Sequence, residues 1–182
     1  MRIISGTRRG QKLSEFGGMD IRPTTDRVRE SLFNLICDYV RDARVLDLFG
    51  GSGALSFEAL SRGAKSAVIV DIDSRSLEVI NQNAQKLRFS EEIRVINKSA
   101  EEFLSGCREK FDLIFLDPPY NKGFITPIIN RIIEKDLLSE DGIIVLESDN
   151  SDEHGEFLGL KILKQRKYGR TYITIYQRGD EV

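Results

Sequence analysis

The chain has 182 residues, of which 40% are hydrophobic and 31% charged, values typical of a globular protein with one domain and a small appendage. The net charge of −2 argues against a general polyanion binder. No apolar run is long enough to span a bilayer and the N-terminus is too brief for a signal-peptide core, so we expect a cytoplasmic protein without a membrane partner.

Cysteine and histidine are scarce. Cys37 and Cys107 are far apart in the sequence, so we expect reduced thiols that pack as small apolar groups. With no CxxC motif and His154 as the only histidine, the chain offers few metal ligands, and we expect no metal site.

The charges are unevenly distributed. Residues 1–14 carry four basic residues and no acid, and residues 157–178 carry six basic residues and no acid. Residues 132–156 hold nine acids against Lys135 alone. Two interpretations remain open: a solvated mixture of faces, or two basic ends that meet in space and flank a phosphate backbone.

The first 40 residues predict a small extension. Residues 2–4 and 12–13 flank a turn with glycine and arginine and predict a hairpin. After Pro23, either Thr24 or Thr25 caps a predicted helix that runs to about Tyr39. Its apolar face is formed by Val28, Leu32, Leu35 or Ile36, and Tyr39. We interpret residues 1–40 as an appendage docked on a sheet domain of residues 41–182.

Short apolar runs alternate with helical stretches from residue 44 to 147. Strands are predicted at 44–49, 67–71, 93–96, 111–116 and 142–147. Helices are predicted at 54–62, at 74–87 with Ser74 as cap, from Ser99 or Ala100, and at 124–135. Crossover helices between fully apolar strands predict an α/β fold with a mainly parallel sheet covered on both faces.

The last part of the chain has a different pattern. Runs 157–163 and 168–176 are joined by a polar stretch, 164–167, which predicts an antiparallel hairpin at the sheet edge. In the second run, tyrosine and threonine alternate with Ile173 and Ile175, so the two sets occupy opposite faces.

A glycine loop, Phe49-Gly50-Gly51-Ser52-Gly53, follows the first strand of the sheet and opens a helix. This placement lets a ligand lie against backbone N–H groups at a helix start. As a dinucleotide fingerprint it is poor, because Ser56 stands where glycine or alanine is expected. A plain tight turn is the alternative.

Asp71 ends the second strand, 18 residues beyond Gly53. A carboxylate at this strand tip can accept hydrogen bonds from both hydroxyls of a ribose. Asp71 could instead only cap a loop. Asp73 is a weaker candidate because it lies past the strand tip, near the next helix start.

Asp117-Pro118-Pro119-Tyr120 stands at the carboxyl end of the fourth strand. Adjacent prolines remove two N–H donors, so the Pro118 carbonyl can face a ligand. With Asp117 as a second acceptor and Tyr120 as a stacking surface, the segment suits a planar group with an exocyclic amine.

These motifs resemble those of class I S-adenosylmethionine-dependent methyltransferases that methylate amino groups. Residues 2–6, 22–34, 55–64 and 168–176 further resemble the bacterial 16S rRNA guanine-N2 methyltransferase family, over essentially the whole chain. The resemblance implies a Rossmann-like seven-stranded sheet with a reversed final hairpin. It also implies S-adenosylmethionine as cofactor and 16S rRNA as partner, within an assembling small ribosomal subunit or free, for a monomeric enzyme.

The resemblance also assigns roles to residues. The cofactor's methionine part would lie on Phe49, Gly50, Gly51 and Gly53 with Asp47 near its amino group, its ribose on Asp71, and its adenine beside Ile72, Ser99 and Ala100. The reacting site would be Asp117, Pro118, Pro119 and Tyr120, and Asp117 would also contact the cofactor. RNA would be held by Arg8, Arg9, Arg22, Thr24, Arg27, Arg29 and Arg170. Arg22 and Arg29 could instead pair with Glu30 or Asp26.

Three alternatives remain. An N6-adenine methyltransferase on RNA or DNA shares every central motif, although Asp rather than Asn at position 117 favours guanine. A nicotinamide-dependent oxidoreductase would leave residues 117–120 unexplained. A non-catalytic RNA-binding module could use the same fold, but both the cofactor loop and the acceptor site are intact.

Overall fold

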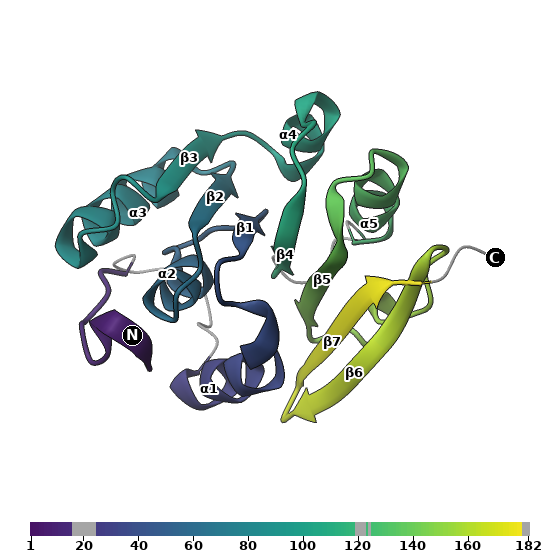
Figure 1. Cartoon of the computed structure of the whole chain (residues 1–182), viewed down its shortest axis with the longest axis horizontal. Helices are drawn as coiled ribbons and strands as arrows, with labels where there is room; N and C mark the ends of the chain where they lie inside the picture. Colours follow the sequence, from purple (N-terminus) through teal and green to yellow (C-terminus); the bar gives the residue numbers. More distant parts are fainter. Residues whose placement is uncertain (16–24, 119–122, 124, 180–182) are drawn as a thin grey trace.

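The computed structural model describes residues 1–15, 25–118, 123 and 125–179. Seven strands form one sheet in the order β3-β2-β1-β4-β5-β7-β6 (Figure 1). The strands are β1 Arg44–Asp47, β2 Ser66–Asp71, β3 Ile93–Asn97, β4 Phe111–Leu116, β5 Leu138–Ser148, β6 Leu160–Tyr168 and β7 Thr171–Arg178. Strands β1 to β5 pair in parallel, and β7 is antiparallel to both of its neighbours. The predicted fold class, a mainly parallel sheet with an antiparallel C-terminal hairpin, is confirmed.

Helices cover both faces of this sheet. They are α1 Asp26–Leu35, α2 Ala54–Ser61, α3 Ser74–Leu87, α4 Ala100–Gly106 and α5 Ile125–Glu134, with short 3-10 turns at Gly6–Arg8, Cys37–Tyr39 and Ser151–Glu153. Residues of α1, α2 and α3 share one hydrophobic cluster, and residues of α4 and α5 share another. Because successive side chains of a strand point to opposite faces, Val45 belongs to the first cluster and Leu46 to the second.

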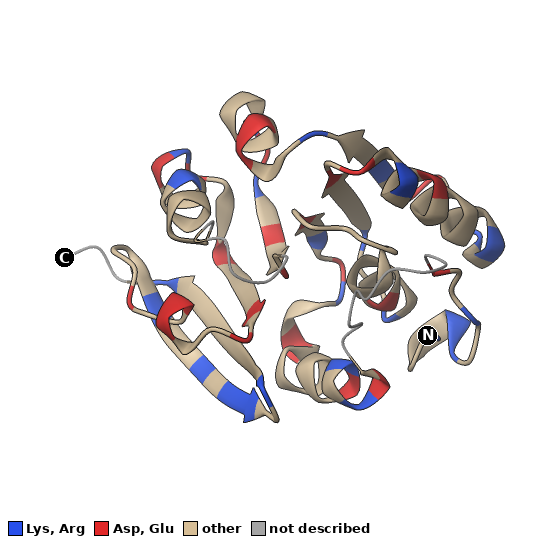
Figure 2. Cartoon of the chain, turned by 180° about the vertical axis from the view of Figure 1, so that it is seen from behind, with Lys and Arg blue, Asp and Glu red and all other residues tan. Residues whose placement is uncertain are grey.

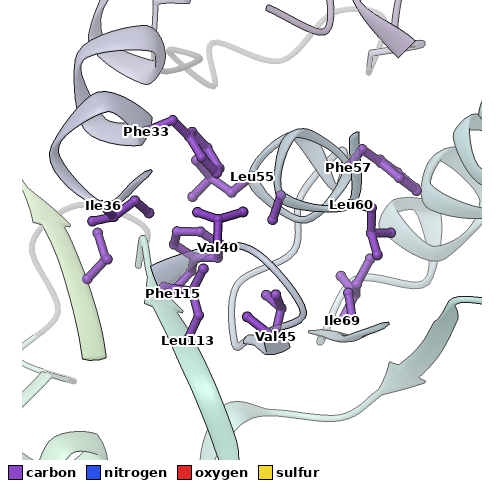
Figure 3. Close-up of a cluster of buried hydrophobic side chains, with 14 of the residues drawn as sticks. Phe33, Ile36, Val40, Val45, Leu55, Phe57, Leu60, Ile69, Leu113 and Phe115 are labelled. Atoms are coloured by element: carbon purple, nitrogen blue, oxygen red, sulfur yellow. The ribbon is translucent and has the colours of Figure 1, made fainter. Parts of the chain in front are cut away.

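The N-terminal segment contributes to the first of these clusters. Ile3 and Leu13 are buried in it, as are Leu32 and Phe33 from α1. The Phe33 ring lies 5.9 Å from that of Phe115 on β4, centroid to centroid (Figure 3). Residues 1–15 and helix α1 therefore share a core with the sheet instead of forming one of their own.

The predicted N-terminal elements are present but shorter than expected. The hairpin is a single antiparallel bridge between Arg2 and Lys12. Thr25 caps α1, its hydroxyl accepting from the N–H of Val28 at 3.3 Å. The helix ends at Leu35, earlier than expected, and the chain continues as a 3-10 turn.

Three local predictions were wrong. The hairpin turns at Gly169-Arg170, where Gly169 has a φ of 62°, while residues 164–167 continue the edge strand β6, whose polar residues face solvent. Asp73 caps α3 in place of Ser74, because its carboxylate accepts from the N–H of Arg75 at 2.9 Å. Cys37 is exposed on the turn after α1, so only Cys107 packs as a small apolar group.

Candidate cofactor and amine-acceptor site

The order of the sheet reverses between β1 and β4, since β2 and β3 lie to one side of β1 and β5 to the other side of β4. Ligands of such sheets bind at the carboxyl ends of the strands that flank this reversal. The glycine loop follows β1, Asp71 ends β2, and Asp117 follows β4. The fold therefore brings the three predicted motifs to one edge of the sheet.

The glycine loop is fastened to the end of β2. Its Gly51 N–H donates to a carboxylate oxygen of Asp71 at 2.8 Å, and its Gly50 N–H donates to the Val70 carbonyl at 2.9 Å. Gly53 begins α2 with a φ of 78°, and a Cβ on it would approach the ring of Phe57 to 2.5 Å. Glycine is thus required where the loop turns into the helix.

Asp47 lies beneath this loop and is fully buried. One of its oxygens accepts from the Ser56 hydroxyl at 2.9 Å, and the other from the Phe49 N–H at 3.4 Å. Burial raises the pKa of Asp47 to about 6, against the opposing effect of these two hydrogen bonds. Ser56, which departs from the dinucleotide fingerprint, is therefore the hydrogen-bond partner of the buried Asp47 carboxyl.

The expected adenine side lies at the ends of β2 and β3. Ile72 is 73% exposed, an uncovered apolar surface next to Asp71. The Asn97 amide donates to the carbonyls of Asp71 and Ile72 at 3.0 and 2.9 Å and fixes this turn. The Ser99 hydroxyl accepts from Glu102 N–H at 3.1 Å as the cap of α4, and Ala100 is buried. These residues fit a flat apolar group packed on Ile72.

The expected amine-acceptor site begins one residue beyond β4. Asp117 is partly buried and Pro118 is buried, whereas Pro119 and Tyr120 lie outside the described residues. Burial raises the pKa of Asp117 well above its ordinary value, and the carboxylates of Glu147 and Asp47 raise it further. The sequence had not singled out Glu147, although its place at the end of a strand beside β4 was a usable signal.

Asn83 is a second residue that the sequence had not singled out. It is fully buried on α3, where its amide donates to the carbonyls of Ser52 and Ser14 at 3.0 and 3.1 Å. Its side-chain oxygen accepts from the N–H of Ser14 at 2.7 Å. Asn83 therefore links the glycine loop to the N-terminal segment.

Some of the residues that were expected to contact RNA lie together, and others do not. Arg9 and Arg27 are exposed and line, with Arg2, a groove of about 270 Å³ between the N-terminal segment and α1. Arg8 is partly buried, with its guanidinium 5.0 Å from the Phe89 ring centroid and its Nε donating to the Leu87 carbonyl. Arg170 is exposed at the hairpin tip, away from this groove. Arg22 and Thr24 lie outside the described residues.

Arg29 was expected to contact RNA, but the structure shows that its side chain is buried. Its side chain is 1% exposed, with Nη2 donating to the Arg2 carbonyl and to the Asp26 carboxylate. Its Nε lies 4.0 Å from a carboxylate oxygen of buried Glu58. Arg29 therefore holds α1 against the N-terminal segment, and the alternative pairing with Asp26 is the correct one.

The two basic ends of the chain do not meet. The N-terminal segment contacts α3 through Arg8 and Leu87, near β3, whereas β6 forms the opposite edge of the sheet. Helix α1 lies between them, and the Lys164 ammonium donates to the Leu35 carbonyl at its end. Figure 2 shows the basic residues of β6 and of the N-terminal segment on opposite sides of the molecule.

Two features are absent from the part of the chain that the structure describes. No helix there is long and apolar enough to cross a membrane. Within the same ranges, no group of three histidine, cysteine or acidic side chains is arranged to hold a metal ion.

The chain is similar to known proteins over nearly its whole length. The family model described as "Conserved hypothetical protein 95" matches residues 1–177. The Bacillus subtilis protein named "Putative rRNA methyltransferase YlbH" is 39% identical over 98% of this chain and 99% of its own length. "Ribosomal RNA small subunit methyltransferase D" of Haemophilus influenzae is 35% identical over 97% of this chain and 93% of its own length. A structure titled "Putative methyltransferase yhhF from Escherichia coli" aligns with a TM-score of 0.88 at 35% identity, over 98% of this chain and 97% of that one. The chain therefore belongs to the Conserved hypothetical protein 95 family, and the resemblance to bacterial rRNA methyltransferases that its motifs indicated is confirmed.

Proposed function

We propose that this protein transfers a methyl group from S-adenosylmethionine to the exocyclic N2 amine of a guanine in 16S ribosomal RNA. The observation that carries the proposal is the meeting of the glycine loop and Asp71 with Asp117 at one edge of the sheet. Names of relatives that this chain covers almost completely supply the ribosomal RNA substrate.

S-adenosylmethionine, when bound, supplies a methyl group on a positively charged sulfur. Gly51, Gly53 and Asp71 hold its methionine and ribose parts, and Ile72 packs against its adenine. Asp117 accepts a hydrogen bond from the guanine amine and directs the nitrogen lone pair toward the methyl group. This is catalysis by positioning and electrostatics. The target base is unpaired or turned out of its helix to reach Asp117, at a cost of a few kcal/mol in a duplex.

Residues 1–40 act as an RNA-binding extension on a methyltransferase domain of residues 41–182. Arg9 and Arg27 contact phosphates along the groove beside α1, whose lining also includes Asp26 and Glu30, and they position the RNA without reading its sequence. The substrate is 16S rRNA, free or within an assembling small subunit, on which the protein acts as a monomer.

The test of the activity is transfer of labelled methyl groups from S-adenosylmethionine. Unmodified 16S rRNA and small subunits assembled from it serve as substrates, and the labelled nucleoside is identified after digestion. N2-methylguanosine is the expected product. N6-methyladenosine would replace the proposal with its nearest alternative, and no incorporation into any RNA would favour a non-catalytic RNA-binding module.

Replacement of Asp117 tests the site. Asp117→Ala should lower turnover by about 100-fold or more, because the amine loses its charged acceptor, while the affinity for S-adenosylmethionine changes little. The matched control is Asp112→Ala, at the other end of the same strand, which should keep wild-type turnover at temperatures below its unfolding transition. Loss of cofactor affinity in Asp117→Ala with normal turnover at saturation would contradict this role.

A further inference from the structure

Asp117 and Glu147 follow neighbouring positions of two parallel strands. Leu116 of β4 pairs with Leu146 of β5, and each carboxylate comes one residue later. On its other side, Glu147 is paired with the apolar Ile173 of β7. Glu147 is only 6% exposed, so its charge acts on Asp117 with little screening by water.

The charged neighbours of Asp117 are acidic. Among the described residues, the charges that shift its titration are Glu147 on β5 and Asp47 on β1, and both disfavour its ionised form. Asp47 is already engaged by Ser56 and Phe49 beneath the glycine loop. Burial raises the pKa of Asp117 most, and Glu147 is the charged neighbour whose repulsion adds most to that effect.

We propose that Glu147 is a positioning residue for methyl transfer: from the neighbouring strand β5 it prepares the Asp117 carboxylate to take up the proton that the methylated amine releases. The proposal rests on the proposed function and adds a residue to it. A general base works best when its pKa lies near the working pH, and an ordinary exposed aspartate falls far below that range.

The step balances without another reagent. The lone pair of the guanine amine forms the new nitrogen–carbon bond, while the sulfur–carbon bond breaks and its electron pair stays on sulfur. The nitrogen, now positively charged, gives one proton to the Asp117 carboxylate. Asp117 later returns this proton to solvent, which restores its carboxylate for the next turnover.

The experiment is the pH profile of the single-turnover methylation rate on unmodified small subunits, with enzyme in excess so that product release does not limit the rate. The rate should fall at low pH as Asp117 becomes protonated. In Glu147→Gln this fall should move to lower pH by roughly one unit, because a like charge has been removed. The plateau rate should also decrease, by roughly 10-fold, since a weaker base accepts the proton.

Two further variants separate this role from a structural one. Glu147→Asp keeps a carboxyl at this position and should show the same pH profile of the methylation rate as the wild type. Glu140→Gln makes the same change at the exposed other end of β5 and should also leave the profile unmoved. A lower rate in Glu147→Gln with an unmoved profile overturns the inference while leaving the proposed function intact. Absence of N2-methylguanosine with the wild-type enzyme overturns the proposed function itself.

Discussion

The Asp71 carboxylate accepts the backbone N–H of Gly51, so the residue expected to bind the ribose also holds the glycine loop. Its other oxygen accepts the N–H of Asp73, each bond measuring 2.8 Å. A carboxylate offers about four lone-pair positions, and these two bonds leave room for hydroxyl donors. The glycine loop and the expected ribose site therefore share the Asp71 carboxylate, and a substitution at Asp71 affects both.

Asp71→Ala should weaken the binding of S-adenosylmethionine and of S-adenosylhomocysteine by about 10- to 100-fold, the loss expected for one or two charge-assisted hydrogen bonds. Isothermal titration calorimetry measures both ligands. The control is Asp73→Ala, which removes the cap of α3 and should lower the unfolding temperature with little change in affinity. Equal losses of affinity in the two variants would show that Asp71 acts only on the fold.

Asp47 should reduce stability at neutral pH. Its pKa of about 6 in the folded protein lies above the ordinary 3.8, so the folded state binds the proton more tightly than the unfolded chain. The contribution of this group to the free energy of unfolding is most favourable below pH 4 and decreases as pH rises through 6. The free energy of unfolding of Asp47→Asn, relative to that of the wild type, should therefore increase by about 1 to 3 kcal/mol when the pH is raised from 4.5 to 8. Urea titrations at each pH measure this difference.

Asp112 provides the opposite case. Arg44 beside it lowers the pKa of Asp112 to about 2, so its ion pair stabilises the folded protein above pH 4 and is lost as pH falls through 2. Because the pair is partly exposed, Asp112→Asn should cost only about 1 to 2 kcal/mol at pH 7. That cost should decrease in acid. The same trend with pH in both variants would mean that burial does not set the titration of Asp47.

Local sequence patterns predicted the order of strands and helices because each depends on neighbouring residues. The helical spacing of apolar residues defines an element such as α3 without any distant contact, although the predicted cap was one residue too late. Residues 164–167 show the limit, since a polar run is typical both of a turn and of an edge strand. Only the pairing of β6 with β7, together with the positive φ of Gly169, distinguishes the two.

The candidate site could also be predicted only in part from the sequence. Asp71 and Asp117 could be placed because parallel strands bring their carboxyl ends to one edge. The roles of Ser56 and Asn83 could not, since each depends on how a helix packs against another segment, whereas the position of Glu147 at the end of a strand was a usable signal. Arg29 was assigned to RNA through the family resemblance, and its buried position depends on a contact with Glu58, which lies 29 positions further along the chain.

Glu58 should be the main attachment point of the N-terminal segment. Its buried carboxylate accepts from the N–H groups of Ile4 and Ser5 at 2.7 and 3.0 Å, and from the Arg62 guanidinium at 2.7 Å. Glu58→Ala should cost about 3 to 5 kcal/mol, because Arg29 loses a nearby countercharge in a buried position. Hydrogen exchange should show lost protection at Ile4 and Ser5 before any change in the sheet. Uniform loss of protection across β1 to β5 would contradict a local attachment.

Arg27 and Arg29 stand two positions apart on α1 and point in different directions, so they separate RNA binding from folding. Arg27 is exposed beside the groove, and Arg27→Ala should weaken binding to 16S rRNA and reduce the slope of log affinity against log salt by about one, with the unfolding temperature unchanged. Arg29→Met should lower the unfolding temperature while leaving the salt slope unchanged, because its guanidinium already binds Asp26 and the Arg2 carbonyl. Filter binding across a salt series and thermal denaturation measure the two effects independently. An unchanged slope in Arg27→Ala would exclude this groove from the RNA contact and leave Arg170 at the hairpin tip as the next residue to replace.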